Sequence, residues 1–200
     1  PYISYDKSFG NKYNLLFETG YYHNYNRYEM VNRIYNESLH YLSFFEMSAY
    51  ATAKVSYSEL YTLTTKLTVD NNPWFSNSAH LYPAISGQWN IGNEKFMQGS
   101  KFLSQLYFTS TYSVSSNSPL PHYDIDLHES LKPAKTRKFN AGLYAIIKND
   151  GIGLSLNYYI HSNKNVNFEH SSFLQTEMEI INSFSMQNSG YILSIDLKKM

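Results

Sequence analysis

Residues 138–162 read KFNAGLYAIIKNDGIGLSLNYYIHS and carry the clearest structural pattern in the chain. Apolar and polar side chains alternate on both sides of Asp150-Gly151, as they do in β-strands that have two unlike faces. Asp-Gly is a strong signal for a tight hairpin turn, because both central residues need a positive φ. A turn centred there pairs Ile147 with Leu154, so that apolar side chains meet at every second step. The segment therefore predicts an antiparallel β-hairpin.

The same reasoning predicts two more hairpins. Near the C-terminus, apolar residues alternate on both sides of 188–189, and a turn there closes a hairpin. Upstream, a three-residue connection at 58–60 would pair Tyr57 with Tyr61, and one long strand with a kink is the alternative. Further strands are expected at 12–23, 83–91 and 101–114.

The chain is expected to form one domain over residues 1–200, since single domains usually contain about 100–200 residues. Loops are expected near 26–40, 71–82, 115–134 and 163–170. Within 26–40 the apolar residues have helical spacing, which predicts a short helix inside that loop. The strand count is nine if 115–134 is one loop, and ten if 122–128 is itself a strand.

The composition limits the classes of protein to which the chain can belong. Aromatic residues make up 17% of it and twenty are tyrosines, whereas charged residues make up 16%, against roughly 25% in typical soluble domains. Sixteen basic and sixteen acidic side chains cancel. Nucleic-acid-binding domains have a basic patch, so nucleic acid is not an expected partner. Cysteine is absent, which excludes disulfides, thiol nucleophiles and cysteine metal sites.

Two all-β architectures fit the alternating pattern. In a transmembrane β-barrel, one face of each strand contacts lipid and the other lines a polar lumen, with Tyr and Trp at the interfaces. A β-sandwich rich in Tyr, Ser and Asn shows the same alternation. Strand length favours the barrel, because 101–114, 138–148 and 172–186 reach the roughly 9–11 residues that a tilted membrane-crossing strand needs. We therefore expect an all-β, antiparallel up-and-down transmembrane β-barrel, or part of a larger one, with the sandwich as the alternative.

One polar run has the residue types of a metal site. His122, Asp124, Asp126 and His128 point to one side of an extended chain, and imidazole with carboxylate is a ligand set for zinc and similar ions. Alternate residues of a strand lie about 7 Å apart, so these ligands need a bend in order to converge. A polar strand that faces solvent or a lumen is the other interpretation. No cofactor is expected.

Two further groupings bear on whether the protein is an enzyme. His161-Ser162-Asn163 has the residue types of a serine hydrolase, but its histidine and serine are adjacent and point to opposite faces of a strand. Glu177 and Glu179 share a face and could form a carboxylate pair. No nucleophile elbow, phosphate loop or zinc helix motif is present. We therefore expect a protein that is not an enzyme.

Aromatic residues are the last group with a candidate role. Trp74 and Trp89, together with Tyr21, Tyr22 and Tyr25, could form a platform on which sugars stack. In a barrel, the same residues would form a belt at the membrane interface, and this interpretation is favoured.

The Tyr-, Asn- and Ser-rich alternating strands, the absence of cysteine and the Asp150-Gly151 hairpin resemble Gram-negative outer-membrane β-barrel proteins over the whole chain. This resemblance implies an outer-membrane location, contact with membrane lipid, and a non-enzymatic role in transport, surface nutrient uptake or adhesion. It also implies other outer-membrane subunits as partners. Nine strands would leave the two ends of the chain on opposite sides of the membrane, which favours part of a larger barrel wall. The alternative is a secreted or cell-surface β-sandwich that binds glycan or protein through Tyr-rich loops.

Overall fold

One antiparallel sheet accounts for nearly all of the described chain. The computed structural model describes residues 1–32, 37–71, 79–117, 134–147, 151–171 and 178–197, and for 26–32, 37–46, 117, 167–171 and 178–183 it describes the backbone alone. The sheet contains nine strands in sequence order, β1 (Tyr2–Phe9), β2 (Tyr13–Asn32), β3 (Glu37–Tyr57), β4 (Tyr61–Asn71), β5 (Ala79–Trp89), β6 (Leu103–Asn117), β7 (Ala134–Ile147), β8 (Ile152–Ser171) and β9 (Met178–Leu197).

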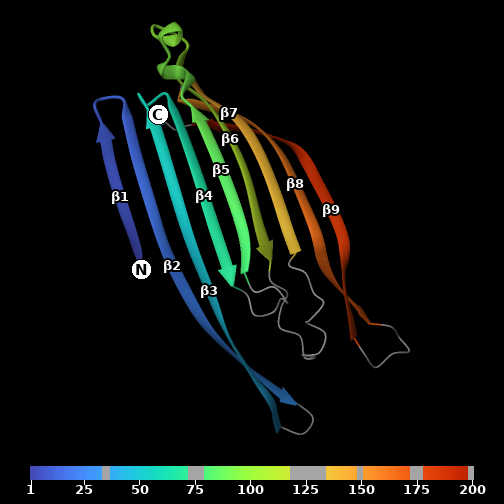
Figure 1. Cartoon of the computed structure of the whole chain (residues 1–200). Coiled ribbons are helices and arrows are strands. Elements are labelled where there is room, and N and C mark those ends of the chain that lie inside the picture. Colours follow the sequence, from blue (N-terminus) through green and yellow to red (C-terminus); the bar gives the residue numbers. More distant parts are fainter. Residues whose placement is uncertain (33–36, 72–78, 118–133, 148–150, 172–177, 198–200) are drawn as a thin grey trace.

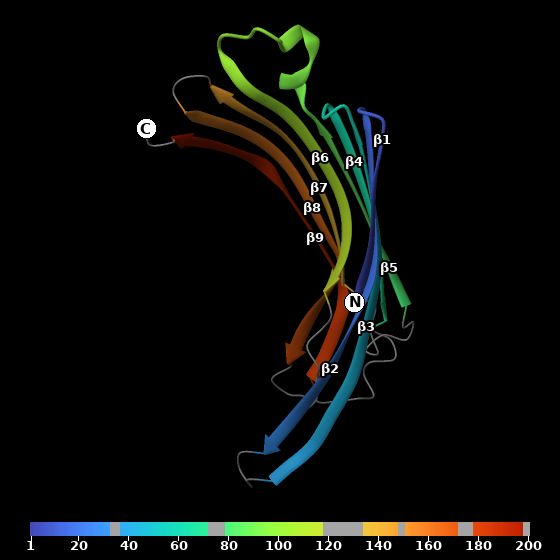
Figure 2. The same cartoon turned by 90° about the vertical axis from the view of Figure 1, so that its left-hand side faces the viewer.

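The strands lie side by side as an up-and-down meander (Figure 1). Each strand pairs only with its neighbours in sequence, and β1 and β9 do not pair with each other in the described chain. Seen from the side, the sheet is a curved wall (Figure 2). No second sheet packs against it among the described residues, so the structure does not support the β-sandwich alternative.

The two faces of the wall differ in chemistry. Strand pairing places Leu67 of β4 beside Ala51 and Pro83. The next residue of β4, Thr68, lies beside Tyr50 and Tyr82. The face that carries Leu67 is called the apolar face, and the face that carries Thr68 is called the polar face. Large hydrophobic side chains follow the apolar face through all nine strands, as the period-two pattern predicts.

Burial is inverted relative to a soluble domain. Many large hydrophobic side chains of the apolar face are exposed, for example Leu193 with 70% of its surface accessible. Among the described side chains, Tyr82 at 7% is the one buried hydrophobic residue and Ser48 at 4% the one buried polar residue, and both lie on the polar face. Folding of this sheet in water would leave its apolar side uncovered, which a soluble protein avoids.

The hairpin at 58–60 is confirmed with the predicted register. Tyr57 pairs with Tyr61 and Val55 with Leu63, so the kinked-strand alternative is wrong. The three-residue turn contains two left-handed residues, Ser58 and Glu59, with φ values of 47° and 56°.

The hairpin between β7 and β8 is confirmed, but its predicted register is wrong by two residues. Leu154 pairs with Ala145 rather than with Ile147. The last described pair is Ile146 with Gly153, so the connection is longer than a two-residue turn. Because the shift is an even number, the same faces still meet and the apolar ladder is preserved.

The predicted turn at 188–189 is wrong. Both residues lie inside β9, which pairs with β8 from Leu197 back to Met178. Asn188 pairs with His161 and Ser189 with Ile160, so the strand runs straight through. The missed strand β1 compensates for this error, and the predicted count of nine strands agrees with the nine that are described.

The loops predicted near 26–40 and 163–170 are largely strand. β2 extends to Asn32 and β3 begins at Glu37, so no helix forms in the described part of 26–40. The register shifts between Met30 and Val31, and this irregularity breaks the two-residue period that the prediction relied on. Residues 163–170 belong to β8.

The strands fall into two length classes. β4 and β5 have 11 residues each, whereas β2, β3, β8 and β9 have 20 or 21. The long pairs project beyond the others at one end of the wall, which is called the long-strand end (Figure 1). At the opposite end, the turn end, short connections join β1 to β2 and β3 to β4, and 3-10 turns η1 (Ile91–Asn93) and η2 (Lys95–Met97) lie between β5 and β6. The described helical segments include none that could cross a membrane.

Candidate functional site

The polar face carries a network of hydrogen-bonded side chains on its first three strands. Asn14 donates to Asp6 Oδ1 at 3.1 Å and to Ser8 Oγ at 3.2 Å. Across the next strand pair, the Tyr50 hydroxyl donates to Glu18 Oε1 at 2.9 Å. The carboxylates on this face are therefore held by neighbouring strands rather than by water alone.

A cation completes the central part of this network. The ammonium of Lys66 lies 5.2 Å from the centre of the Tyr50 ring, an arrangement that attracts the positive charge to the ring face. Lys66 comes from β4, Tyr50 from β3 and Glu18 from β2, so one cation, one ring and one carboxylate are aligned across three strands. Such a surface offers both donors and acceptors to a polar solute.

The most buried part of the polar face lies towards the long-strand end. Ser48 Oγ donates to Asp70, which pairs with His80 on the next strand. The rings of His80 and Tyr82 are 6.5 Å apart. These residues were missed by the sequence prediction, because the motif exists only across strands and its signal appears only after the register is known.

Glycines on the polar face leave room for tyrosine rings. A Cβ at Gly190 would lie 3.1–3.3 Å from the ring and hydroxyl of Tyr159, the residue opposite it. At Gly20, a Cβ would lie 2.9 Å from the Tyr50 ring. Each ring covers backbone that a glycine leaves open, which fixes strand register in a sheet without a hydrophobic core.

A belt of aromatic rings crosses the apolar face at the turn end. The ring centres of Tyr13 and Tyr57 are 4.9 Å apart, those of Tyr57 and Tyr61 6.4 Å, and those of Tyr61 and Trp89 6.3 Å. Trp89 then pairs with Phe108. This continuous row of amphipathic rings is typical of a membrane interface.

Glu94 ties the belt to the turn that follows β5. Its Oε1 accepts hydrogen bonds from the Tyr61 hydroxyl at 2.6 Å and from the Trp89 indole N–H at 3.0 Å. The hydrogen bond from Tyr61, and then that from Trp89, lower the pKa of the Glu94 carboxyl, because both donors favour its ionised form. Sequence reasoning missed Glu94, since the turn brings it back over residues of two strands.

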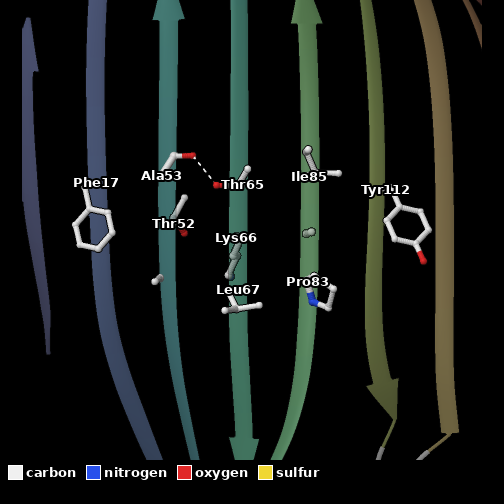
Figure 3. A pocket seen from close by; sticks show the side chains of 11 residues that line it. Phe17, Thr52, Ala53, Thr65, Lys66, Leu67, Pro83, Ile85 and Tyr112 are labelled. Atoms are coloured by element: carbon white, nitrogen blue, oxygen red, sulfur yellow. Dashed lines mark hydrogen bonds between the residues drawn. The ribbon is translucent and has the colours of Figure 1, made fainter.

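A shallow open depression lies on the apolar face in the middle of the wall (Figure 3). Its floor consists of small or short side chains such as Ala53, Thr65 and Pro83, and Phe17 and Tyr112 stand at its two sides. The Thr65 hydroxyl donates a hydrogen bond to the Ala53 carbonyl oxygen at 3.4 Å, so its polar group has a partner. The depression therefore presents apolar atoms and fits a hydrocarbon chain better than a polar ligand.

The predicted metal-site residues, His122, Asp124, Asp126 and His128, lie outside the described residues. Within the part of the chain that the structure describes, no group of three or more potential ligands could hold a metal ion. The metal site therefore stays a prediction.

The other predicted groupings are separated by the sheet. His161 and Asn163 lie on the polar face and Ser162 on the apolar face, since their partners alternate in the same way. The ring centres of His161 and Tyr159 are 5.1 Å apart. Glu177 lies outside the described residues, and the backbone of Glu179 pairs with His170. The described chain thus holds no serine–histidine arrangement at this position.

The aromatic residues divide between the faces. Trp74 lies outside the described residues, and Trp89 belongs to the belt at the turn end. Tyr21 pairs with Ala49 on the apolar face, whereas Tyr22 pairs with Ser48 on the polar face. Tyr21, Tyr22 and Tyr25 are exposed near the long-strand half of β2, so they form no single platform with Trp89.

Comparison with solved structures identifies proteins with the same architecture. The chain superposes on the RagAB peptide importer in its closed-closed state with a TM-score of 0.77 and 20% identity, covering 97% of this chain and 26% of that one. It superposes on the FrpB iron transporter from Neisseria meningitidis with a TM-score of 0.63 and 16% identity, covering 98% of this chain and 32% of that one.

The likeness is one of fold. No family model and no curated protein matches the sequence. The chain spans about a quarter of the length of the RagAB chains that it matches. The fold is an all-β, antiparallel up-and-down sheet of the kind that builds the wall of a Gram-negative outer-membrane β-barrel.

Proposed function

We propose that this chain forms part of the wall of an outer-membrane transport barrel, with its apolar face against lipid and its polar face towards the lumen. The observation that carries the proposal is the inverted burial. Exposed hydrophobic residues such as Leu67 and Leu193 cover one side of the wall, while the network of polar side chains around Glu18 and Tyr50 lies on the other. Only a surrounding that is itself apolar makes this arrangement favourable.

The dimensions of the apolar face support the same proposal. From Tyr61 of the belt to Val69, each apolar-face residue of β4 is uncharged. Eight residues of strand span about 26 Å along the strand, which at a tilt of about 35–45° covers about 20 Å of the apolar band of about 25 Å that outer-membrane barrels present. The aromatic belt marks one edge of this band.

Transport is favoured over a purely structural role by the polar face. Its aligned Glu18, Tyr50 and Lys66 present both charges and hydrogen-bonding groups. The similar solved structures are a peptide importer and an iron transporter, which makes uptake of a polar solute the class of function to test first. A non-enzymatic role belongs to the same proposal.

A partner subunit at the long-strand end is also part of the proposal. β2, β3, β8 and β9 are about twice as long as β4 and β5, and a membrane crossing needs only about 9–11 residues. The extra length projects beyond the membrane band as paired strands. These projections offer a surface to a second outer-membrane protein.

The membrane assignment is tested on the complete gene product. We expect it to fractionate with the outer membrane, to need detergent for extraction, and to migrate differently on gels with and without boiling. A protein that stays soluble and compact without detergent would contradict the proposal. For transport, cells that lack the gene should lose uptake of labelled peptide or of chelated iron, and unchanged uptake of both would remove transport of these two cargo classes.

A further inference from the structure

Glu94 is a carboxylate held against the apolar face at the turn end. It joins η1 to η2 in the connection that follows β5. Its Oε1 accepts hydrogen bonds from the Tyr61 hydroxyl at 2.6 Å and from the Trp89 indole N–H at 3.0 Å. Both donors belong to the aromatic belt, whose rings lie on the apolar face. The carboxylate is therefore fixed beside the surface that is proposed to contact lipid.

No cation of the described chain pairs with this carboxylate. Both hydrogen bonds go to Oε1, so Oε2 has no donor among the described residues. The hydrogen bond from Tyr61, and then that from Trp89, lower the pKa of the carboxyl, which keeps Glu94 ionised at neutral pH. No lysine or arginine of the described chain, the adjacent Lys95 included, contributes to that shift. The negative charge is therefore open to an external cation.

A shallow hollow, called the belt hollow, opens on the apolar face beside the carboxylate. Its lining includes Tyr61 and Trp89 themselves, together with Leu63, Gly87 and Phe108. The floor is low because Gly87 has no side chain, and a Cβ there would meet nothing within 4 Å. Since the two residues that hold the carboxylate also line the hollow, one ligand can contact both.

The combination of a carboxylate and an apolar hollow restricts the chemistry of that ligand. A small soluble cation would pair with Glu94 but leave the hollow uncovered. A neutral hydrocarbon would fill the hollow but leave the charge unpaired, which is costly beside an apolar medium. A molecule with a cationic head and a hydrocarbon tail satisfies both surfaces. Rings of the belt kind lie at the level of lipid headgroups, so a membrane lipid fits the position as well.

We propose that Glu94 binds the ammonium group of a phospholipid with an ethanolamine headgroup, and that an acyl chain of this lipid lies in the belt hollow over Gly87. Outer-membrane barrels place their short connections on the periplasmic side, so the lipid belongs to the periplasmic leaflet. This inference rests on the proposed membrane location of the wall. It assigns one lipid class to one place, in addition to the general contact with the bilayer that any such wall makes.

The first experiment compares lipids and needs no variant. The complete gene product in mild detergent is mixed with equal amounts of dioleoyl phosphatidylethanolamine, phosphatidylcholine and phosphatidylglycerol, and the retained lipids are measured by native mass spectrometry. The acyl chains are identical. The first headgroup has an ammonium that donates hydrogen bonds, the second has a cation without N–H groups, and the third has no cation. We expect the ethanolamine lipid to be retained most, and equal retention of all three would overturn the inference.

The second experiment removes the charge alone. Glu94→Gln keeps a side-chain oxygen that can accept both hydrogen bonds, but it cannot pair with an ammonium. Because hydrogen bonds to charged groups are the strong ones, this variant should retain the ethanolamine lipid about tenfold less well than the wild type. Glu59→Gln is the matched control, since it removes the same charge from the turn between β3 and β4, outside the belt hollow. Equal losses in both variants would mean that net charge alone matters.

The third experiment fills the hollow and leaves the charge in place. Gly87→Val adds a side chain where there is room for it, and a β-branched residue suits a strand. This variant should fold and should lose retention of the ethanolamine lipid, and unchanged retention would show that no acyl chain lies over Gly87. Free ethanolamine at the same concentration as the lipid should not displace it. Displacement would identify a site for a free amine instead.

The gel shift on boiling separates this inference from the proposed function. A protein that shows the shift but retains the three lipids equally contradicts the inference alone. A protein that shows no shift contradicts the membrane barrel itself. If Glu94→Gln fails to assemble, the ranking of lipids by the wild type and the loss on Gly87→Val still decide the inference.

Discussion

Gly20 and Gly87 illustrate how differently single residues are constrained on the two faces. A Cβ at Gly20 would lie 2.9 Å from both the Pro1 carbonyl oxygen and the Tyr50 ring, whereas a Cβ at Gly87 would meet nothing within 4 Å. The first glycine lies on the polar face under a ring, and the second on the open apolar face. Identical substitutions at these sites should therefore have opposite effects.

We expect Gly20→Ala to destabilise the folded wall by about 1–3 kcal/mol, the usual cost of overpacking. Gly87→Ala should stabilise it by about 0.5–1 kcal/mol, because alanine loses less backbone freedom in a strand. Urea unfolding of the complete gene product in detergent, followed by the gel shift, measures both. Equal effects of the two substitutions would contradict the proposed packing of the Tyr50 ring.

The Glu94 carboxylate should make the belt sensitive to acid. Its hydrogen bonds from Tyr61 and Trp89 lower its pKa below the ordinary glutamate value of 4.5. A carboxyl with a lowered folded pKa stabilises the structure fully above its unfolded value, and this stabilisation disappears as the pH falls through the folded value. Loss of the belt contact should therefore occur below pH 4.5.

Tryptophan fluorescence can follow this transition. In a Trp74→Phe background, Trp89 emission should change with a midpoint below pH 4.5, and Glu94→Gln should abolish that change. A midpoint at or above this value, or an unchanged titration in the Gln variant, would exclude the proposed contact.

The accuracy of the predicted strand registers and strand ends depends on the turn sequences between them. The 58–60 turn was predicted with its register, because the alternation on both sides leaves one three-residue solution. The turn signal of Asp150-Gly151 gave the right hairpin and faces but the wrong length, since parity cannot distinguish registers that differ by two residues. At 188–189 the Asn-Ser-Gly sequence imitates a turn, although its glycine is there to admit the Tyr159 ring.

The left-handed backbone of the 58–60 turn predicts an improvement. Ser58 and Glu59 have φ values of 47° and 56°, which cost a residue with a Cβ about 1–2 kcal/mol each. Glu59→Gly should recover about 1 kcal/mol of this strain, and Gly10→Ala, at a φ of 60°, should lose a similar amount. Thermal stability of the detergent-solubilised protein measures both effects. Destabilisation by Glu59→Gly would contradict the turn geometry.

The candidate sites were harder to predict than the elements. The sequence predicts an interface role for single residues such as Trp89, because tyrosine and tryptophan have that preference in any barrel. Strand register across β3, β4 and β5 brings Ser48, Asp70 and His80 together. Register between β7 and β8 places Lys135 opposite Lys164. No pattern along one strand contains that information.

For the whole molecule, the two faces predict unequal tolerance to charge. Leu67 and Thr52 lie at nearly the same level, since Leu67 pairs with Ala51 and Lys66 pairs with Thr52. Leu67→Arg should cost about 1–3 kcal/mol of stability in the membrane, because the cost of arginine on the lipid face falls from about 2–4 kcal/mol at the middle of the bilayer to about 0–1 kcal/mol near the interfaces. Thr52→Arg, on the polar face between Glu18 and Lys66, should be tolerated.

The measurement is the fraction of the complete gene product that reaches the boiling-sensitive form in the outer membrane. A matched pair at one level removes depth as a variable, so a difference must come from the face. Equal assembly of both variants would show that the apolar face does not meet hydrocarbon.

The strictly sequential order of the strands has a consequence for how such walls change size. Every described strand is bonded only to its predecessor and its successor, so no pairing spans distant parts of the chain. Duplication or loss of one hairpin would then alter the circumference while every other pairing stays as it was. A meander can therefore grow by one hairpin at a time, whereas a sheet whose strands are interleaved cannot. Local pairing of this kind also allows folding to start at any hairpin and to spread to its neighbours.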